Sequence, residues 1–262
     1  MPVVPISDSA DERLSDYRDL TDRHLRQLRE SAEGFFIAES ELALRAAAEV
    51  GWPVRSVLLT ADKLASLEAL VDGLDTQVFV ASRPVMDAVG GFKIHRGVLA
   101  AVERPAVHQW SALVAGAGPL LLAEEVNDLE NMGSIFRVAA AFGAQAVILS
   151  PRSADPLYRR CVRVSLGHVM RVPFAVAHDW PEPLSHLESA GWRVAGLSPA
   201  GSTELDDLPT DSPTALVVGA EGPGLSARAL AACTDKVRIE TSAAVDSLNV
   251  AVAAAVALHE VA

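Results

Sequence analysis

The stretch NDLENMGSIFRVAAAFGAQAVIL at residues 127–149 decides the fold of this chain, together with VVGAEGPGLS at 217–226 and VRIETSAAVDSLNVAVAAAVALHE at 237–260. Each stretch joins a short apolar run to a turn rich in Asn, Gly or Glu. Short apolar runs bounded by such turns are typical of strands buried in a parallel sheet. Ligands of open α/β sheets bind beside the turns at the carboxyl ends of the strands. The three turns therefore predict one shared site.

Six apolar runs between residues 120 and 241 alternate with helical segments. They are LLLAEEV at 120–126, AQAVILS at 144–150, VMRVPFAV at 169–176, RVAGLSP at 193–199, TALVVGA at 214–220 and KVRIET at 236–241. Runs without polar alternation suit a parallel sheet covered by helices on both faces. The second half is therefore predicted to be an α/β domain that ends in an Ala-rich helix at 248–261. The small side chains of this helix suit packing in the core or at the interface of a dimer.

The first half also alternates strands and helices, after a charged surface helix predicted at 11–30. Strands are predicted at 35–39, 54–60, 77–81 and 97–103, and helices at 40–50, 61–74 and 82–91. This pattern predicts a small α/β unit. The Ala- and Gly-rich segment 104–119 resembles a linker. We therefore place a boundary near Ala112, which gives two domains, 1–111 and 112–262.

The chain has 262 residues, half of them apolar, and a formal net charge of −12. This charge argues against a protein that coats nucleic acid, because sequence-independent affinity for phosphate comes from Lys and Arg. Two local basic clusters stand out nevertheless. The candidate RNA-binding residues in them are Arg152, Arg159, Arg160 and Arg163, with Arg171 nearby, and Lys93 and Arg96, with His95 between them. A solvated surface strip explains the first cluster equally well.

Several classes of protein are disfavoured by what the sequence lacks. No uncharged apolar stretch approaches the roughly 20 residues needed to cross a bilayer, and the N-terminus is acidic where a signal peptide would be basic. A cytoplasmic protein without a membrane partner is therefore expected. The two cysteines, Cys161 and Cys233, form no CxxC motif and no His pair has metal-ligand spacing, so we expect neither a disulfide nor a metal site.

The glycine-rich turn after the run TALVVGA carries Gly219, Gly222 and Gly224. Glycine at these positions permits positive φ and close approach of the backbone to a ligand. A dinucleotide-binding turn reads G-x-G-x-x-G, whereas this turn reads G-x-x-G-x-G and places Glu221 where it would repel a pyrophosphate. A nicotinamide cofactor is therefore disfavoured, and a cationic ligand such as a sulfonium is compatible with the carboxylate.

Two further groups of polar residues accompany the glycine turn. Asn131 and Arg137 stand near the start of a helix that follows a strand, and Ser247 and Asn249 stand at the start of the last helix. Taken singly, each has an ordinary structural explanation, such as a surface salt bridge or a helix cap. Their common order along the chain is the stronger signal.

The three motifs N-x-G-x-x-x-R, G-x-E-G-x-G-L and I-(x)8-L-N-V resemble, in order and spacing, those of the SpoU, or TrmH-like, family of RNA ribose 2′-O-methyltransferases in the SPOUT superfamily. The resemblance covers roughly the last 140 residues. The first domain is similar to the substrate-binding domain of many members, an α/β module related to RNA-binding ribosomal proteins. FKIHRGVLAAVERP at 92–105 resembles the closing strand of that module.

The resemblance implies a trefoil-knotted catalytic domain that binds S-adenosylmethionine, needs no metal, acts as a homodimer and methylates RNA, with ribosomal RNA favoured by the added domain. It implies a catalytic group made of Asn131, Arg137, Glu221, Ser247 and Asn249. It implies cofactor contacts from Leu197, Gly219, Glu221, Gly222, Ile239, Leu248 and Asn249.

The chain departs from the family pattern beside the predicted cofactor pocket. Where members commonly read Ile-Pro-Met and then Gly two residues later, this chain has Ile239, Glu240, Thr241 and Ala243, and Val138 replaces a Thr. One alternative is therefore a non-catalytic RNA-binding or assembly protein with a weakened cofactor pocket. Another is a dinucleotide-dependent enzyme in which Glu240 imitates the ribose-binding acid. Cofactor binding distinguishes the three hypotheses.

Overall fold

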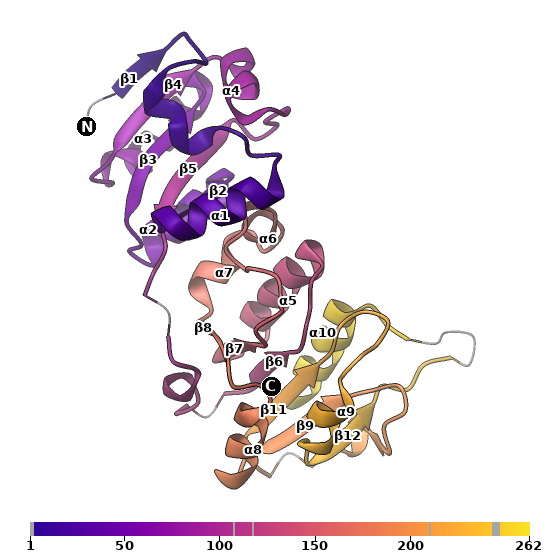
Figure 1. Ribbon diagram of the computed structural model, residues 1–262. Helices are drawn as coiled ribbons and strands as arrows, with labels where there is room; N and C mark the ends of the chain where they lie inside the picture. The colour runs from indigo at the N-terminus through magenta and orange to yellow at the C-terminus, as the bar shows by residue number, and fades with distance from the viewer. Residues whose placement is uncertain (1–2, 107, 117, 210, 243–246) are drawn as a thin grey trace. The chain divides into compact units, whose positions relative to one another are not determined.

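The computed structural model describes residues 3–106, 108–116, 118–209, 211–242 and 247–262 (Figure 1). The chain forms two compact units, one made of Met1–Ala106 with Leu157–Met170 and the other of Val107–Pro156 with Arg171–Ala262. The predicted boundary near Ala112 falls inside the second unit. The return of Leu157–Met170 to the first unit was not predicted, because no local pattern reports which unit a helix joins.

The first unit contains a mixed five-stranded sheet in the order β1-β4-β3-β5-β2. Its strands are β1 (Val3–Ile6), β2 (Phe35–Glu39), β3 (Val54–Leu59), β4 (Gln77–Ala81) and β5 (Val98–Glu103). β5 runs antiparallel to both β2 and β3, and the other pairs are parallel. The four strands predicted here are confirmed. β1 was missed, since it has only four residues and Pro5 inside it argues against a strand.

The helices of the first unit are short and polar on one side. They are η1 (Glu12–Tyr17), α1 (Arg23–Glu33), α2 (Glu41–Glu49), α3 (Ala61–Asp72), α4 (Arg83–Gly90) and α6 (Arg159–Val164), and α7 (His168–Arg171) ends at the division between the units. The continuous helix predicted at 11–30 is wrong. The chain turns at Asp19, which has φ of 55°, and Asp22 then caps α1 by accepting from the Leu25 amide at 2.9 Å. An Asp at such a position competes with the helix interior and starts a new helix.

The second unit contains a seven-stranded sheet in the order β10-β12-β9-β11-β6-β7-β8. The strands are β6 (Leu120–Ala123), β7 (Ala146–Leu149), β8 (Phe174–Val176), β9 (Arg193–Leu197), β10 (Thr203–Glu204), β11 (Thr214–Val218) and β12 (Asp235–Arg238). Every neighbouring pair is parallel. The predicted α/β class with a buried parallel sheet is confirmed. The run VMRVPFAV is a strand only after Pro173, because its first residues belong to α7.

Helices cover this sheet and bring distant segments together (Figure 1). They are η2 (Trp110–Leu113), α5 (Leu129–Ala141), α8 (Glu182–Ser189), η3 (Leu205–Asp207), α9 (Ala227–Ala231) and α10 (Val250–Val261). α10 packs against α5 and β11, and the residues of β6, β7 and β11 are buried. The strands β6 and β11 are neighbours, so the turns after them lie at the same edge of the sheet. The trefoil knot stays a prediction.

A search for membrane spans in the described part of the chain finds no helix with the length and apolar character to cross a bilayer.

Candidate active site

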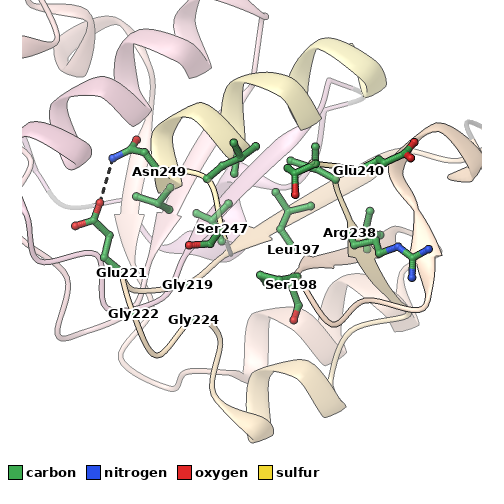
Figure 2. A pocket seen from close by; sticks show the side chains of 18 of the residues that line it. Leu197, Ser198, Gly219, Glu221, Gly222, Gly224, Arg238, Glu240, Ser247 and Asn249 are labelled. Carbon is green, nitrogen blue, oxygen red and sulfur yellow. Dashed lines mark hydrogen bonds between the residues drawn. The ribbon is translucent and has the colours of Figure 1, made fainter. Parts of the chain in front are cut away.

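A cavity of about 800 Å³ opens in the second unit, beside the carboxyl ends of β9, β11 and β12 and the start of α10. Figure 2 shows Glu221 and Asn249 at one end of it and Arg238 and Glu240 at the other. The predicted cofactor residues all line the cavity: Leu197, Gly219, Glu221, Gly222, Ile239, Leu248 and Asn249. Ser247, predicted as catalytic, lines it too. Two of the three turns singled out in the sequence, those at 217–226 and 237–260, therefore line this cavity, and the stretch 127–149 is joined to it through the hydrogen bond between Asn131 and Asn249.

The glycine turn has a backbone that only glycine fits well. A Cβ on Gly219 would lie 2.2 Å from the Gly224 carbonyl carbon and 2.3 Å from the Leu225 nitrogen, so no side chain can be placed there. Gly222 and Gly224 have φ of 86° and 70°, which favours glycine. The Gly224 amide donates to the Ala220 carbonyl at 2.9 Å and closes the turn. The turn thus presents bare backbone to the cavity.

A buried carboxylate fastens this turn to the neighbouring strand. Glu124 directly follows β6 and is only 5% exposed. One of its oxygens accepts from the Ser226 amide at 2.7 Å, and the other accepts from the Ser226 hydroxyl and from the Trp180 indole, both at 2.8 Å. The Ser226 hydroxyl in turn caps α9 by accepting from the Ala229 amide. Sequence reasoning missed Glu124. The only available signal was an acid placed straight after an apolar run.

Asn249 is the centre of a hydrogen-bonded group at the mouth of the cavity. Its Oδ1 accepts from the amides of Ala251 and Val252 and so caps α10. Because the cap fixes the oxygen, the Nδ2 group must face away from the helix. It donates to Asn131 Oδ1 at 2.8 Å and to Glu221 Oε1 at 3.1 Å (Figure 2 draws the second bond).

This arrangement leaves two groups available to a ligand. Asn131 is 8% exposed, and its Oδ1 is occupied by Asn249, so its Nδ2 is the end that can donate to another oxygen. Glu221 is exposed and keeps its second carboxylate oxygen as an acceptor. Asn131 and Glu221, which are 90 positions apart in the sequence, therefore combine a donor and an anionic acceptor at one end of the cavity.

A family model described as SpoU rRNA Methylase family matches residues 119–259, which is more than half of the chain. A protein of Mycobacterium bovis described as an uncharacterized tRNA/rRNA methyltransferase is 40% identical over 99% of this chain and 92% of its own length. The chain belongs to the SpoU rRNA methylase family. It is therefore an RNA methyltransferase by family, and the resemblance drawn from the three motifs is confirmed.

Two further SpoU relatives bear on the chemistry. A 23S rRNA (guanosine-2′-O-)-methyltransferase RlmB of a Burkholderia species is 35% identical over 73% of this chain and 79% of its own length. The crystal structure of the SpoU methyltransferase AviRb from Streptomyces viridochromogenes, in complex with AdoMet, superposes with a TM-score of 0.82 at 25% identity and covers 96% of this chain and 97% of AviRb. The likeness extends over both units and not only over the SpoU segment.

The remaining residue of the predicted SpoU catalytic group is Arg137. It lies on α5, six residues after Asn131, and its side chain is exposed. It does not line the cavity, and within the described ranges its guanidinium has no hydrogen bond or ion pair. Among the residues that the structure describes, no group of three or more His, Cys, Asp and Glu could hold a metal ion.

The departures from the SpoU pattern lie at the other end of the cavity. Glu240 and Thr241 line it, and Ala243 lies outside the described residues. Arg238 donates to Glu204 through Nε at 2.7 Å, and this bond raises the pKa of the guanidinium above its ordinary value. This end thus offers carboxylates and hydroxyls, where the family usually has a proline and a methionine.

The predicted RNA-binding residues have different surroundings. Arg152 is exposed and pairs with Glu125. Arg159 is mostly buried, pairs with Glu39 and stacks over the Phe92 ring with its guanidinium carbon 4.3 Å from the ring centroid.

Arg163 also pairs with Glu39, and Arg160 has an interaction partner of its own. The solvated-strip interpretation is therefore wrong for Arg159, whose guanidinium is held by a buried carboxylate. Lys93 and Arg96 are exposed on the loop before β5. An RNA-binding role for any of these residues stays a prediction.

Proposed function

We propose that this SpoU protein transfers a methyl group from S-adenosylmethionine to a ribose 2′-hydroxyl of ribosomal RNA. The observation that carries the proposal is the hydrogen-bonded group of Asn249, Asn131 and Glu221, which is held at the sheet edge beside a glycine turn. It offers a hydrogen-bond donor for a ribose or phosphate oxygen and a carboxylate for a cation, the two features that the reaction needs.

The cavity fits the cofactor in size and in charge. Its volume lies within the range of about 300–1,000 Å³ that is typical of small-molecule sites. Gly219, Gly222 and Gly224 line the cavity with backbone, and Glu221 suits an ammonium or sulfonium but not a pyrophosphate. When bound, S-adenosylmethionine supplies an electrophilic methyl group whose bonding pair stays with sulfur as a neutral thioether.

The side chains of the chain would act on the nucleophile. A ribose hydroxyl is weakly nucleophilic at neutral pH, so holding it in line and stabilising developing negative charge on its oxygen are the main contributions. Asn131 Nδ2 is a donor for that ribose or for the adjacent phosphate. Arg137 has an unpaired guanidinium within the described residues, which suits a bidentate grip on a phosphate. A guanidinium is a poor general base, so we assign the released proton to phosphate or water.

The first test is calorimetric titration of the purified chain with S-adenosylmethionine and S-adenosylhomocysteine, with NAD as the control. We expect dissociation constants on the order of micromolar for the first two and no heat with NAD. Binding of NAD alone would support the dinucleotide hypothesis. Absence of all binding would support the non-catalytic hypothesis.

The second test asks where the methyl group goes. Ribosomal RNA incubated with the protein and labelled cofactor is hydrolysed with alkali, which needs a free 2′-hydroxyl. A methylated ribose leaves a labelled, alkali-resistant dinucleotide, whereas a methylated base leaves labelled mononucleotides. Labelled mononucleotides alone would overturn the ribose assignment.

A matched substitution tests the role of Arg137. Arg137→Lys keeps the charge but loses the planar pair of donors, so we expect kcat to fall by about tenfold to a hundredfold with cofactor affinity unchanged. Near-normal turnover would contradict the bidentate role.

We also propose that two copies associate and that the enzyme works in the cytoplasm, where ribosomal RNA is found. The support for a dimer is an apolar face on α10, where Val252 and Val256 are 49% and 40% exposed one helical turn apart. Light scattering should give twice the chain mass, and Val256→Lys should give the monomer mass. A wild-type monomer would refute the dimer.

A further inference from the structure

The cavity of the second unit has two ends with different chemistry. Glu221 and Asn249 lie at one end, and Arg238 and Glu240 lie at the other (Figure 2). Glu240 directly follows Ile239, at the position where members of the family commonly have a proline. A proline side chain has no hydrogen-bonding atom. Glu240 therefore gives this end of the cavity a carboxylate that the common family pattern does not supply.

The Glu240 carboxylate is available to a ligand, whereas its cationic neighbour is already engaged. Arg238 donates to Glu204 Oε1 through Nε at 2.7 Å and through a second nitrogen of the guanidinium, and the two residues are register partners on β12 and β10. Glu240 is exposed, and the described parts of the chain give it no hydrogen bond or ion pair. Because Glu204 balances the charge of Arg238, Glu240 leaves this end with an unpaired anionic acceptor.

The chemistry of the cofactor decides which of its groups faces Glu240. The methyl group has to lie beside Asn249, Asn131 and Glu221 to reach a ribose oxygen that this group holds. The sulfur that carries the methyl group is bonded to C5′ of the ribose, and adenine is the terminal group on the far side of that ribose. Adenine therefore extends toward the opposite end of the cavity. Its 6-amino group is the one N–H donor of the base, and a carboxylate can only accept.

We propose that Glu240 selects the base of the cofactor by accepting a hydrogen bond from the 6-amino group of adenine. The inference rests on the proposed function, because it takes the methyl group to lie beside Asn249. A base with oxygen at C6, such as hypoxanthine, would set an acceptor against the carboxylate, and two acceptors repel each other. Glu240 thus determines specificity through an attraction for adenine and a repulsion of its 6-oxo counterpart.

The test is calorimetric titration of the full chain with S-adenosylhomocysteine and with S-inosylhomocysteine, in which oxygen replaces the 6-amino group. We expect the wild type to bind the adenosyl compound at least about tenfold more tightly, because the inosyl compound loses a hydrogen bond to a charged group. Glu240→Gln can turn either its oxygen or its NH2 group to the base, so the preference should fall to about threefold or less.

A second variant and a matched control complete the test. Glu240→Ala removes the acceptor, so it should weaken binding of S-adenosylhomocysteine by about threefold to tenfold and leave S-inosylhomocysteine no weaker. The control Glu188→Gln makes the same change at an exposed acid of α8 that lies outside the lining of the cavity, and it should keep the preference of the wild type. A wild type with equal affinity for the two compounds would overturn the proposal. A preference that survives in Glu240→Gln and Glu240→Ala would overturn it too.

The outcomes separate this inference from the proposed function. Binding of S-adenosylhomocysteine with a preference that does not depend on Glu240 would refute only the role of Glu240. A methyl group found on a base instead of a ribose, together with the expected losses in the Glu240 variants, would refute only the ribose assignment. Absence of binding of both compounds to the wild type would refute the cofactor site and this inference together.

Discussion

Replacement of Glu124 by Gln is the sharpest test of how the glycine turn is held. The substitution keeps the shape of the side chain and removes its charge. One carboxylate oxygen faces the Ser226 amide at 2.7 Å, and the other faces the Trp180 indole at 2.8 Å. Both of these groups can only donate. Whichever way the Gln amide turns, its NH2 group therefore faces an N–H and leaves that donor without a partner.

The magnitude follows from those contacts. One unpaired, largely buried donor costs about 1–3 kcal/mol, and the hydrogen bonds that remain lose their charge assistance. We expect Glu124→Gln to lower the free energy of unfolding of the second unit by about 2–3 kcal/mol. For a unit of this size the melting temperature should fall by roughly 4–10 °C.

Glu125→Gln is the matched control, since it makes the same change at the next residue. Glu125 pairs on the surface with Arg152, whose side chain is 76% exposed, and such pairs contribute about 0–1 kcal/mol. Scanning calorimetry should report both variants. The unfolding transition of the second unit is the one whose midpoint temperature rises when S-adenosylmethionine is added, because a ligand stabilises the unit that binds it. Equal midpoints for the two variants would refute the role assigned to Glu124.

Three further predictions concern single residues. Gly219→Ala should abolish cofactor binding, because its Cβ would lie 2.2 Å from the Gly224 carbonyl carbon. In the control Gly73→Ala, the nearest neighbour of the Cβ lies at 3.4 Å, so this variant should bind the cofactor normally in the same titration. Normal binding by both variants would refute the close packing of Gly219 against Gly224. Asn249→Asp keeps the α10 cap but places a second carboxylate beside Glu221. We expect kcat to fall at least about tenfold, with little change in melting temperature. A large loss of stability would instead indicate that Asn249 has a purely structural role. Burial raises the pKa of Cys233 from 9.0 to about 12, so the folded state retains a proton that the unfolded state releases. The stability that depends on this thiol is present below about pH 9 and lost as the pH rises towards about 12, and a Cys233→Ala variant should lose less stability over that window than the wild type.

The parallel sheet and its cavity could be predicted because their signals are local. Apolar runs without alternating polar residues predicted the strands of the second unit, and the spacing of Gly219, Gly222 and Gly224 predicted the turn. The motif order then brought Asn131, Glu221 and Asn249 to one place, where the structure joins them by hydrogen bonds.

What could not be predicted depends on contacts between distant segments. Glu124 is one of two adjacent acids in the sequence, and only the pairing of β6 with β11 brings it to Ser226. Arg159 is one of several arginines in a basic stretch, and only the fold shows that Glu39 holds it. The break at Asp19 was missed for a different reason, since charged residues with helical spacing hid the capping role of Asp22.

The return of Leu157–Met170 to the first unit has a consequence for dissecting the protein. Since the chain passes between the two units three times, no single cut releases both intact. A fragment that ends at Ala106 would lack Arg159 and Arg163, the two cations that pair with Glu39 in the whole chain. Each unit is therefore folded from discontinuous segments of the chain. An engineered exchange of the first unit would have to include this internal segment as well as the N-terminal one.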